Sequence, residues 1–465
     1  MHMKYKKWFK RKNSLTASFV LLVQRLLRAR SCSRGQPELQ EPKAGLQHVA
    51  VAVCHRTAAG GLRPIPGPIV LLKKGIFRGG CDKGICSKCG RLLYKAMKYN
   101  AVDTNPLSMY VMQHLWNRIV KIVPLWIAPN LLTFSGFLLL LINYFVLCFY
   151  DWDYTASGSE LIPNWVWWFA AFSTFSAYAL DSIDGKHARR TQSSSPLGEL
   201  FDHGLDSWAT SLFTLSWFSV CVSPVDSPGF SEHKMFLLLS IILLNFMLSH
   251  WEKYNTGVLF LPWGYDLSQV MLVGGYLLTA IVGVEIWHKP LVFGYYAPSV
   301  TLALVIACSI FLSLPQTMYN IYTAYQKKTL KKDSLYEALL PLVSPTLLFS
   351  LLTIWVTLSP CDILIKQPRL FLFMVGVAFS SVACRVIICQ MSNTRSESFH
   401  SLLFPLALVV FAAVTGLLGK LEESAFMAFT ALLTLAHVHY GVCVGRQLSQ
   451  HLNIYIFSMK KRAQE

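Results

Sequence analysis

The sequence predicts an all-α polytopic membrane protein with about ten transmembrane helices and an N-terminal interfacial helix. The chain has 465 residues, of which 54% are hydrophobic and 14% are charged, and its mean hydropathy is +0.43. Soluble domains usually contain about 25% charged residues. Apolar runs long enough to cross a bilayer also recur along most of the chain. Composition and run length together exclude an ordinary soluble fold.

The basic charge of the chain is confined to one end. The first 100 residues hold 21 Lys and Arg against 3 Asp and Glu, which accounts for the whole net charge of +18. A basic tail does not indicate a nucleic-acid partner for the rest of the chain. We predict a basic, disordered extension over 1–98, a membrane domain over 99–458 and a short basic tail over 459–465. A transit peptide is the alternative interpretation of the extension.

The first helix predicted after the extension covers 106–124 and lies in the membrane interface. Its apolar residues recur at helical intervals: Met109, Met112, Leu115, Ile119 and Ile122. Polar and basic residues occupy the positions between them, as is typical of an interfacial helix. The alternative is a helix that packs against soluble parts of the protein.

Ten apolar runs of spanning length follow, and proline residues blur some of their boundaries. The runs are 131–150, 163–180, 200–222, 235–250, 267–287, 298–318, 338–358, 370–391, 401–419 and 424–444. Lys and Arg concentrate in the connections after the second, fourth and sixth runs, which share one side of the membrane. By the positive-inside rule this side is cytoplasmic. Both termini are then predicted to be cytoplasmic as well.

Four aspartates flank the connection between the second and third runs. Asp181 and Asp184 are three residues apart, and Asp202 and Asp206 are four apart, so each pair shares a helix face. The turn "SSSPLG" makes the two helices antiparallel neighbours. Carboxylates at a membrane boundary are functional candidates because burying charge is costly. Oxygen-rich sites suit Mg²⁺ or Mn²⁺, and four carboxylates predict two ions.

Small and basic residues accompany the aspartates. Gly185, Ala188 and Gly198 allow the backbone of a neighbouring helix or a phosphate group to approach closely. Arg189 can donate two parallel hydrogen bonds to phosphate oxygens. Carboxylates, small residues and arginine together predict a diphosphate site. The alternative is an ion-paired cytoplasmic loop.

The stretch "DSIDGKHARRTQSSSPLGELFDHGLD" resembles the signature D-x2-D-G-x2-A-R-x8-G-x3-D-x3-D of the CDP-alcohol phosphotransferases. The signature fixes the residue type at eight of 26 positions, and this sequence matches all eight without a gap, so the resemblance is specific. It implies the fold of that family and two Mg²⁺ or Mn²⁺ ions on Asp181, Asp184, Asp202 and Asp206. It also implies that Gly185, Ala188, Arg189 and Gly198 shape the CDP pocket.

Residues 100–458 also resemble members of this family that transfer phosphoethanolamine. This wider resemblance implies the substrates and the place of the reaction. Phosphoethanolamine would pass from CDP-ethanolamine to diacylglycerol, or to alkyl-acylglycerol, in the endoplasmic reticulum or Golgi membrane, with the active site facing the cytoplasm. Transfer of phosphocholine is the alternative within this class. A divalent-cation transporter is the rival class, but transporters tend to place their ligands near the membrane midplane. The sequence leaves a homodimer open.

Three further residues are candidates for the site. Asn130, in "APN", resembles a nucleotide contact, and a helix N-cap is the alternative. His203 is favoured over Asp206 as the base that takes the proton of the acceptor hydroxyl, because an aspartate that holds a metal is a poorer base. The alternative is that His203 only donates or accepts a hydrogen bond beside the site. Glu252, beside Trp251 and Tyr254, is predicted to favour the primary ammonium of ethanolamine over the trimethylammonium of choline, which has no N–H donor. The alternative is a surface glutamate paired with Lys253 or a loop amide.

Overall fold

A computed structural model describes residues 101–154, 162–221, 230–261, 264–291, 294–332 and 334–459. All of these residues belong to one compact unit. The predicted extension 1–98 lies outside the described residues, as do 460–465 of the predicted tail.

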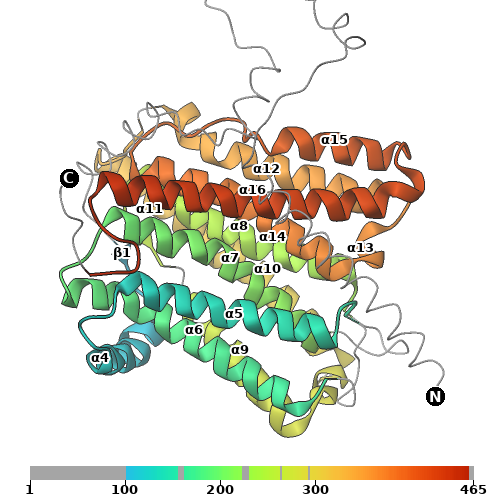
Figure 1. The fold of residues 1–465 in the computed structure, drawn as a ribbon, viewed down its shortest axis with the longest axis horizontal. Coiled ribbons are helices and arrows are strands. Elements are labelled where there is room, and N and C mark those ends of the chain that lie inside the picture. The colour runs from blue at the N-terminus through green and yellow to red at the C-terminus, as the bar shows by residue number, and fades with distance from the viewer. Residues whose placement is uncertain are drawn as a thin grey trace, which may run out of the picture. The chain divides into compact units, whose positions relative to one another are not determined.

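The described residues are almost entirely helical (Figure 1). In chain order the elements are β1 (Ala101–Val102), η1 (Ser108–Met112), α4 (Gln113–Ile122), α5 (Pro129–Tyr150), α6 (Asn164–Arg190), α7 (Pro196–Cys221), α8 (Glu232–Thr256), β2 (Leu259–Phe260), α9 (Gly264–Val282), η2 (Val284–His288), α10 (Ala297–Cys308), η4 (Ser309–Ser313), α11 (Leu314–Gln326), α12 (Leu335–Leu358), α13 (Ile363–Lys366), α14 (Pro368–Met391), α15 (Leu403–Val414), η5 (Gly419–Leu421) and α16 (Glu422–His451). The two short strands pair in parallel, with Ala101 opposite Leu259.

Each of the ten predicted apolar runs coincides with a helix, and α10, η4 and α11 form one continuous helix. Among the described residues, seven helices are long and apolar enough to cross a membrane. The helices α6 and α7, which carry the four aspartates, and the 12-residue α15 are not among the seven. The all-α membrane fold is therefore confirmed, whereas the number of ten spans stays a prediction.

Proline does not end the helices in which it occurs. The helix α12 continues through both Pro341 and Pro345. The π-helical turn η4 directly precedes α11, which has Pro315 in its first turn. A proline removes one backbone donor, and local changes in helical hydrogen bonding accommodate the loss. The soft boundaries seen in the sequence are thus irregularities inside continuous helices.

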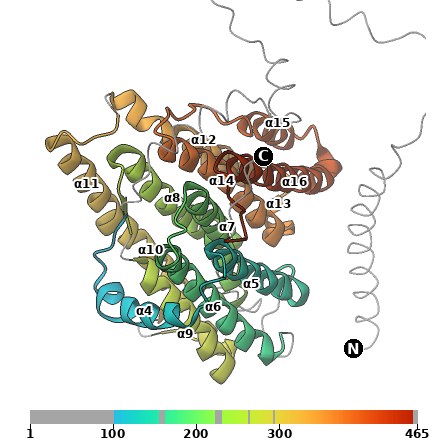
Figure 2. The same cartoon turned by 60° about the vertical axis from the view of Figure 1, so that its left-hand side comes forward.

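Three helices form the centre of the bundle. Figure 2 shows α7, α8 and α14 between a group made by α5, α6 and α9 and a second group made by α12, α15 and α16. The helix α14 is the most deeply buried of the candidate spans, and α7 packs against both α14 and α5. The helices α6 and α7 are consequently held on several sides, which fixes the position of the aspartates they carry.

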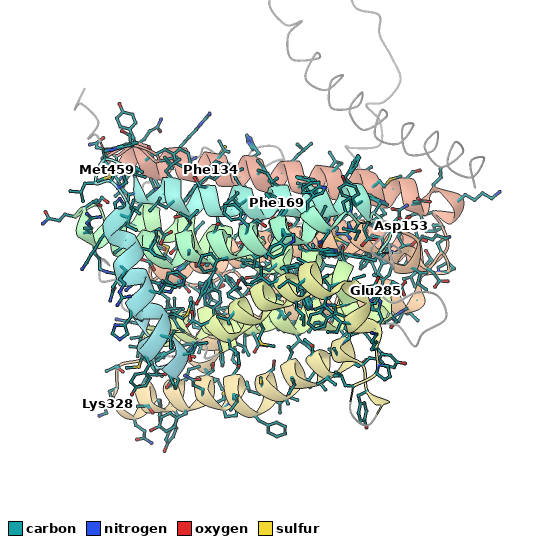
Figure 3. The ribbon with its side chains drawn as sticks, turned by 90° about the horizontal axis from the view of Figure 1, so that it is seen from below. Phe134, Asp153, Phe169, Glu285, Lys328 and Met459 are labelled. Atoms are coloured by element: carbon teal, nitrogen blue, oxygen red, sulfur yellow. The ribbon has the colours of Figure 1, made fainter. Side chains whose placement is uncertain are left out.

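The predicted interfacial helix is confirmed as a helix, η1 followed by α4, and it lies across the ends of the long helices (Figures 1 and 3). Its predicted apolar stripe is divided between two environments. Met112 is buried against α6, together with Trp116 from outside the predicted stripe, whereas Met109 and Ile122 are 50% and 81% exposed. A buried stripe and an exposed apolar stripe are what a helix needs in order to bind both the bundle and a membrane surface.

Candidate functional site

The aspartates lie within long helices instead of beside a loop. The helix α6 continues ten residues past the predicted end of its apolar run and includes Asp181 and Asp184. The turn to α7 is short, and the Ser195 hydroxyl accepts a hydrogen bond from the Gly198 amide at 3.1 Å. A serine that accepts from the first turn of a helix is a typical N-cap. The turn and the cap set α6 and α7 side by side in opposite directions.

The four aspartates come together at one place. Asp181, Asp184 and Asp202 each offer a carboxylate oxygen within 4.8 Å of the others, and Asp202 and Asp206 form a second such group with His203. The two groups share Asp202. Two like charges at 4–5 Å repel by roughly 3–4 kcal/mol at an effective dielectric constant near 20. The arrangement therefore requires protons or cations, and carboxylate oxygens are preferred ligands of hard divalent cations.

Two hydroxyl groups from distant parts of the chain support this cluster. Thr133 of α5 donates a short hydrogen bond to Asp184, and Tyr265 of α9 donates to Asp181 at 2.9 Å. Neither residue could be predicted as part of the site, because nothing near it in the sequence points to the aspartates. Hydrogen bonds of this kind orient metal-binding carboxylates.

The basic residues that follow Asp184 have different roles. Lys186 donates to the Asn117 side chain at 2.8 Å, and Arg190 donates to the Val120 carbonyl at 2.6 Å. Both residues therefore hold α4 against α6. Arg189 is exposed at the end of α6 and is engaged in neither contact with α4. It is the basic residue of this segment that can reach a phosphate group.

The glycines of the motif have side-chain neighbours at ordinary contact distances and do not bring α6 and α7 into close contact. A side-chain carbon added at Gly185 would meet only the Arg189 guanidinium, at 3.7 Å. One added at Gly198 would lie 3.4 Å from the side-chain oxygen Oδ1 of Asn130. Both are ordinary van der Waals distances. Ala188 is half-buried on α6. Close helix packing is instead provided by Gly136 of α5, where an added carbon would lie 3.2 Å from the Ala177 carbonyl oxygen.

Asn130 is brought to the site, and the alternative role as an N-cap is wrong. The N-cap of α5 is Ala128, which makes no side-chain capping bond, and Asn130 lies in the first helical turn. Its side-chain amide donates to the Ile456 carbonyl at 2.9 Å. Its side-chain oxygen, Oδ1, faces Gly198 at the start of α7. The nucleotide contact stays a prediction.

His203 lies beside the aspartates and is 4% exposed. Its Nε2 atom is 4.0 Å from the nearer Asp202 oxygen, and its ring meets the His250 ring edge-on at 5.3 Å between centroids. The imidazole is therefore held between α7 and α8 at the edge of the carboxylate cluster. This position is compatible with its roles both as a base and as a hydrogen-bond partner.

Glu252 lies in a separate environment. Its carboxylate accepts hydrogen bonds from Thr317 at 2.9 Å and from Asn320 at 2.7 Å, and it lines a small cavity between α8 and α11. The alternative of a surface glutamate is wrong, because Glu252 is 3% exposed. Its amide partner, Asn320, lies in the helix α11 and not in a loop. Lys253 pairs with Glu199 at 2.5 Å.

The two aromatic residues that flank Glu252 point elsewhere. The Trp251 indole donates to the Ala338 carbonyl at 2.6 Å, and the Tyr254 hydroxyl accepts from the Ser396 amide at 3.0 Å. The hydrogen bonds that Glu252 accepts from Thr317 and Asn320 do not connect it to the aspartates. Adjacent residues on a helix point in different directions, so the sequence neighbours of Glu252 do not share its surroundings.

The fold and the site define a multi-pass membrane enzyme with a carboxylate-rich centre at the junction of two antiparallel helices. The chain belongs to the CDP-alcohol phosphatidyltransferase family, whose sequence profile matches residues 126–357. This match includes all four aspartates and Asn130. The divalent-cation transporter is accordingly not retained as an alternative.

Curated relatives extend the similarity beyond the matched segment. The chain is 50% identical over 367 residues to the Mus musculus protein named Ethanolaminephosphotransferase 1, covering 78% of this chain and 92% of the relative. The Homo sapiens protein of the same name is 50% identical over 366 residues, with the same coverage. The Arabidopsis thaliana protein named Choline/ethanolaminephosphotransferase 2 is 30% identical over 389 residues, covering 79% of this chain and 96% of the relative.

Proposed function

We propose that this enzyme transfers phosphoethanolamine from CDP-ethanolamine to diacylglycerol, or to alkyl-acylglycerol, and releases CMP. The observation that carries the proposal is the meeting of four aspartates from α6 and α7 at one place. The 50% identity to proteins named for ethanolamine transfer supports the head group. Phosphocholine transfer is not favoured, since the relative named for both head groups is only 30% identical.

The carboxylate cluster fits two Mg²⁺ or Mn²⁺ ions. Asp181, Asp184 and Asp202 would hold one ion, and Asp202 and Asp206 would hold the other, because each group places its oxygen atoms within 4.8 Å. When bound, the ions would supply positive charge that stabilises the diphosphate and the leaving CMP. Oxygen-only ligands suit both metals.

The protein residues bind and orient the nucleotide. Gly185, Ala188 and Gly198 carry no large side chain and so let the diphosphate approach the backbone, and the exposed Arg189 guanidinium donates to its oxygen atoms. Asn130 directs its side-chain oxygen, Oδ1, toward Gly198 and contacts the nucleotide. Positioning and electrostatic stabilisation are the principal means by which proteins promote phosphoryl transfer.

His203 takes the proton of the acceptor hydroxyl. The hydroxyl oxygen then bonds to the phosphorus that carries ethanolamine, and the bond from this phosphorus to the CMP oxygen breaks. Asp206 lies within 4.8 Å of His203 and is the alternative base, but its carboxylate is engaged in the metal site. We further propose that Glu252, which lies outside the carboxylate groups and accepts hydrogen bonds from Thr317 and Asn320, favours the ammonium group of ethanolamine through a charge-assisted hydrogen bond.

The reaction takes place at the cytoplasmic face of the endoplasmic reticulum or Golgi membrane, where the acceptor enters from the bilayer. The basic residues in the last turns of α6 and α8, among them Arg190 and Lys253, support this orientation. Cross-linking in membranes tests whether the enzyme forms a homodimer, which stays an open prediction.

Substitution of the aspartates tests the proposal. Asp181→Asn, Asp184→Asn, Asp202→Asn and Asp206→Asn each keep the side-chain size but remove a charge, so turnover of CDP-ethanolamine should collapse while membrane insertion persists. Asp362→Asn, at an exposed position outside the cluster, is the matched control and should keep normal turnover. If two or more of the cluster variants retain near-normal activity with Mg²⁺, the two-metal site is wrong.

A further inference from the structure

The chain that follows α16 returns to the site. After His451 it turns at Asn453, where the Ser449 hydroxyl donates to the Ile454 carbonyl at 2.6 Å. The part 453–458, the return segment, then passes over the first turns of α5 and α7. Figure 1 shows this dark red segment beside the end of α5, and Figure 3 places Met459 and Phe134 at the same end of the bundle.

The return segment is held by apolar packing. Ile454 and Ile456 pack against a buried cluster formed by Leu197 of α7 and Leu448 of α16. Leu197 is 1% exposed, so its side chain is fully covered at the start of α7. The segment is thus a packed part of the fold at the position where α7 enters the site.

Phe457 completes a group of three aromatic rings. Its ring centroid lies 5.4 Å from that of Phe134 on α5 and 5.5 Å from that of Phe201 on α7. The Phe134 and Phe201 rings are themselves 6.2 Å apart. Spacings of this size are typical of interacting aromatic side chains. The ring of Phe457 is nevertheless 45% exposed, so the group presents an open aromatic face.

Three contacts of the return segment fall on or directly beside, in the sequence, residues of the site. Phe201 directly precedes Asp202, and Phe134 directly follows Thr133, which donates to Asp184. The Ile456 backbone carbonyl accepts a hydrogen bond from the Asn130 side-chain nitrogen, Nδ2. This bond leaves the side-chain oxygen of Asn130, Oδ1, directed at Gly198. The open aromatic face therefore lies next to Ile456, whose partner Asn130 contacts Gly198 at the start of α7.

We infer that the return segment forms one wall of the nucleotide pocket, and that Phe457 with Phe134 and Phe201 provides the face on which the pyrimidine ring of the CDP-alcohol packs. This inference rests on the proposed function. Every nucleobase has a flat apolar face, and stacking on aromatic side chains is a common way to bind it. Because stacking acts on the base and leaves the reacting phosphorus untouched, it contributes to binding more than to turnover.

The test compares Phe457→Ala with Phe457→Tyr, which keeps the ring, and with the control Phe399→Ala. Phe399 is 53% exposed and lies in the connection before α15. Purified variants in nanodiscs are measured for CMP binding with Mg²⁺ and for the kcat and KM of CDP-ethanolamine. We expect Phe457→Ala to weaken CMP binding and to raise the KM by roughly 10–100-fold, with kcat within about threefold of the original value. Phe457→Tyr and Phe399→Ala should behave like the unchanged protein.

Three outcomes would overturn the inference. They are unchanged CMP affinity in Phe457→Ala, a fall in kcat without a change in KM, and a loss of membrane association with normal CMP affinity, which would make Phe457 a lipid anchor. If Phe457→Ala does not fold, Phe457→Leu retains the apolar packing without the ring and is measured in the same way. An unchanged protein that binds CMP but transfers no phosphoethanolamine would refute the proposed function while leaving the wall of the pocket in place.

Discussion

Replacement of Tyr265 by Phe isolates one hydrogen bond of the carboxylate cluster. The Tyr265 hydroxyl donates to an Asp181 oxygen at 2.9 Å, an ordinary length for such a bond. The ring of Tyr265 meets the Tyr178 ring edge-on at 5.9 Å, and phenylalanine preserves this contact. The substitution therefore removes the hydroxyl and leaves the packing of α9 on α6 in place.

The expected loss is in metal affinity. Hydrogen bonds to charged groups contribute about 1.5–3 kcal/mol, and about 1.4 kcal/mol corresponds to a factor of ten. Loss of such a partner typically weakens metal binding by about 10–100-fold. We therefore expect Tyr265→Phe to raise the Mn²⁺ and Mg²⁺ concentrations needed for half-maximal effect by about 10–100-fold, with smaller changes in kcat at saturating metal.

Tyr178→Phe is the matched control. The Tyr178 hydroxyl also donates to an aspartate, but this is Asp266, which lies outside the two carboxylate groups. Electron paramagnetic resonance of Mn²⁺ with the purified protein measures affinity directly, and initial rates against Mg²⁺ concentration measure it through activity. Equal Mn²⁺ affinity in Tyr265→Phe and the unchanged protein, or an equal loss in Tyr178→Phe, would refute an orienting role for the Tyr265 hydroxyl.

Two further predictions concern the base and the head group. His203→Ala should lower the rate of transfer by about 10²–10⁴-fold, with little effect on CDP-ethanolamine binding, if His203 is the general base; lost binding with an unchanged single-turnover rate would return that role to Asp206. Glu252→Gln should lower kcat/KM for CDP-ethanolamine more than for CDP-choline, shifting their ratio by about 1–2 kcal/mol, because a charge-assisted hydrogen bond is lost. Equal effects on both substrates would make Glu252 a structural partner of Thr317 and Asn320.

Local patterns in the sequence determined the fold class and the location of the carboxylate cluster. Spanning helices could be predicted because each must satisfy its own backbone and present about 20 apolar residues to lipid. The aspartates could be paired because the spacing of Asp202 and Asp206 fixes a shared helix face, and because a short turn connects them to Asp184. Both kinds of inference use only residues that are close in the chain.

Only the tertiary structure decided which distant residues meet this cluster. Thr133 and Tyr265 lie 51 and 84 residues from the aspartates they contact, and Ile456 lies 326 residues from Asn130. Their sequence surroundings contain no sign of these partners. The same limit explains Glu252, for which the sequence offered a head-group contact or a surface glutamate, whereas the packing of α8 on α11 gave it hydrogen-bond donors. Helical periodicity shows which residues share a face, but the facing element depends on the packing of the whole bundle.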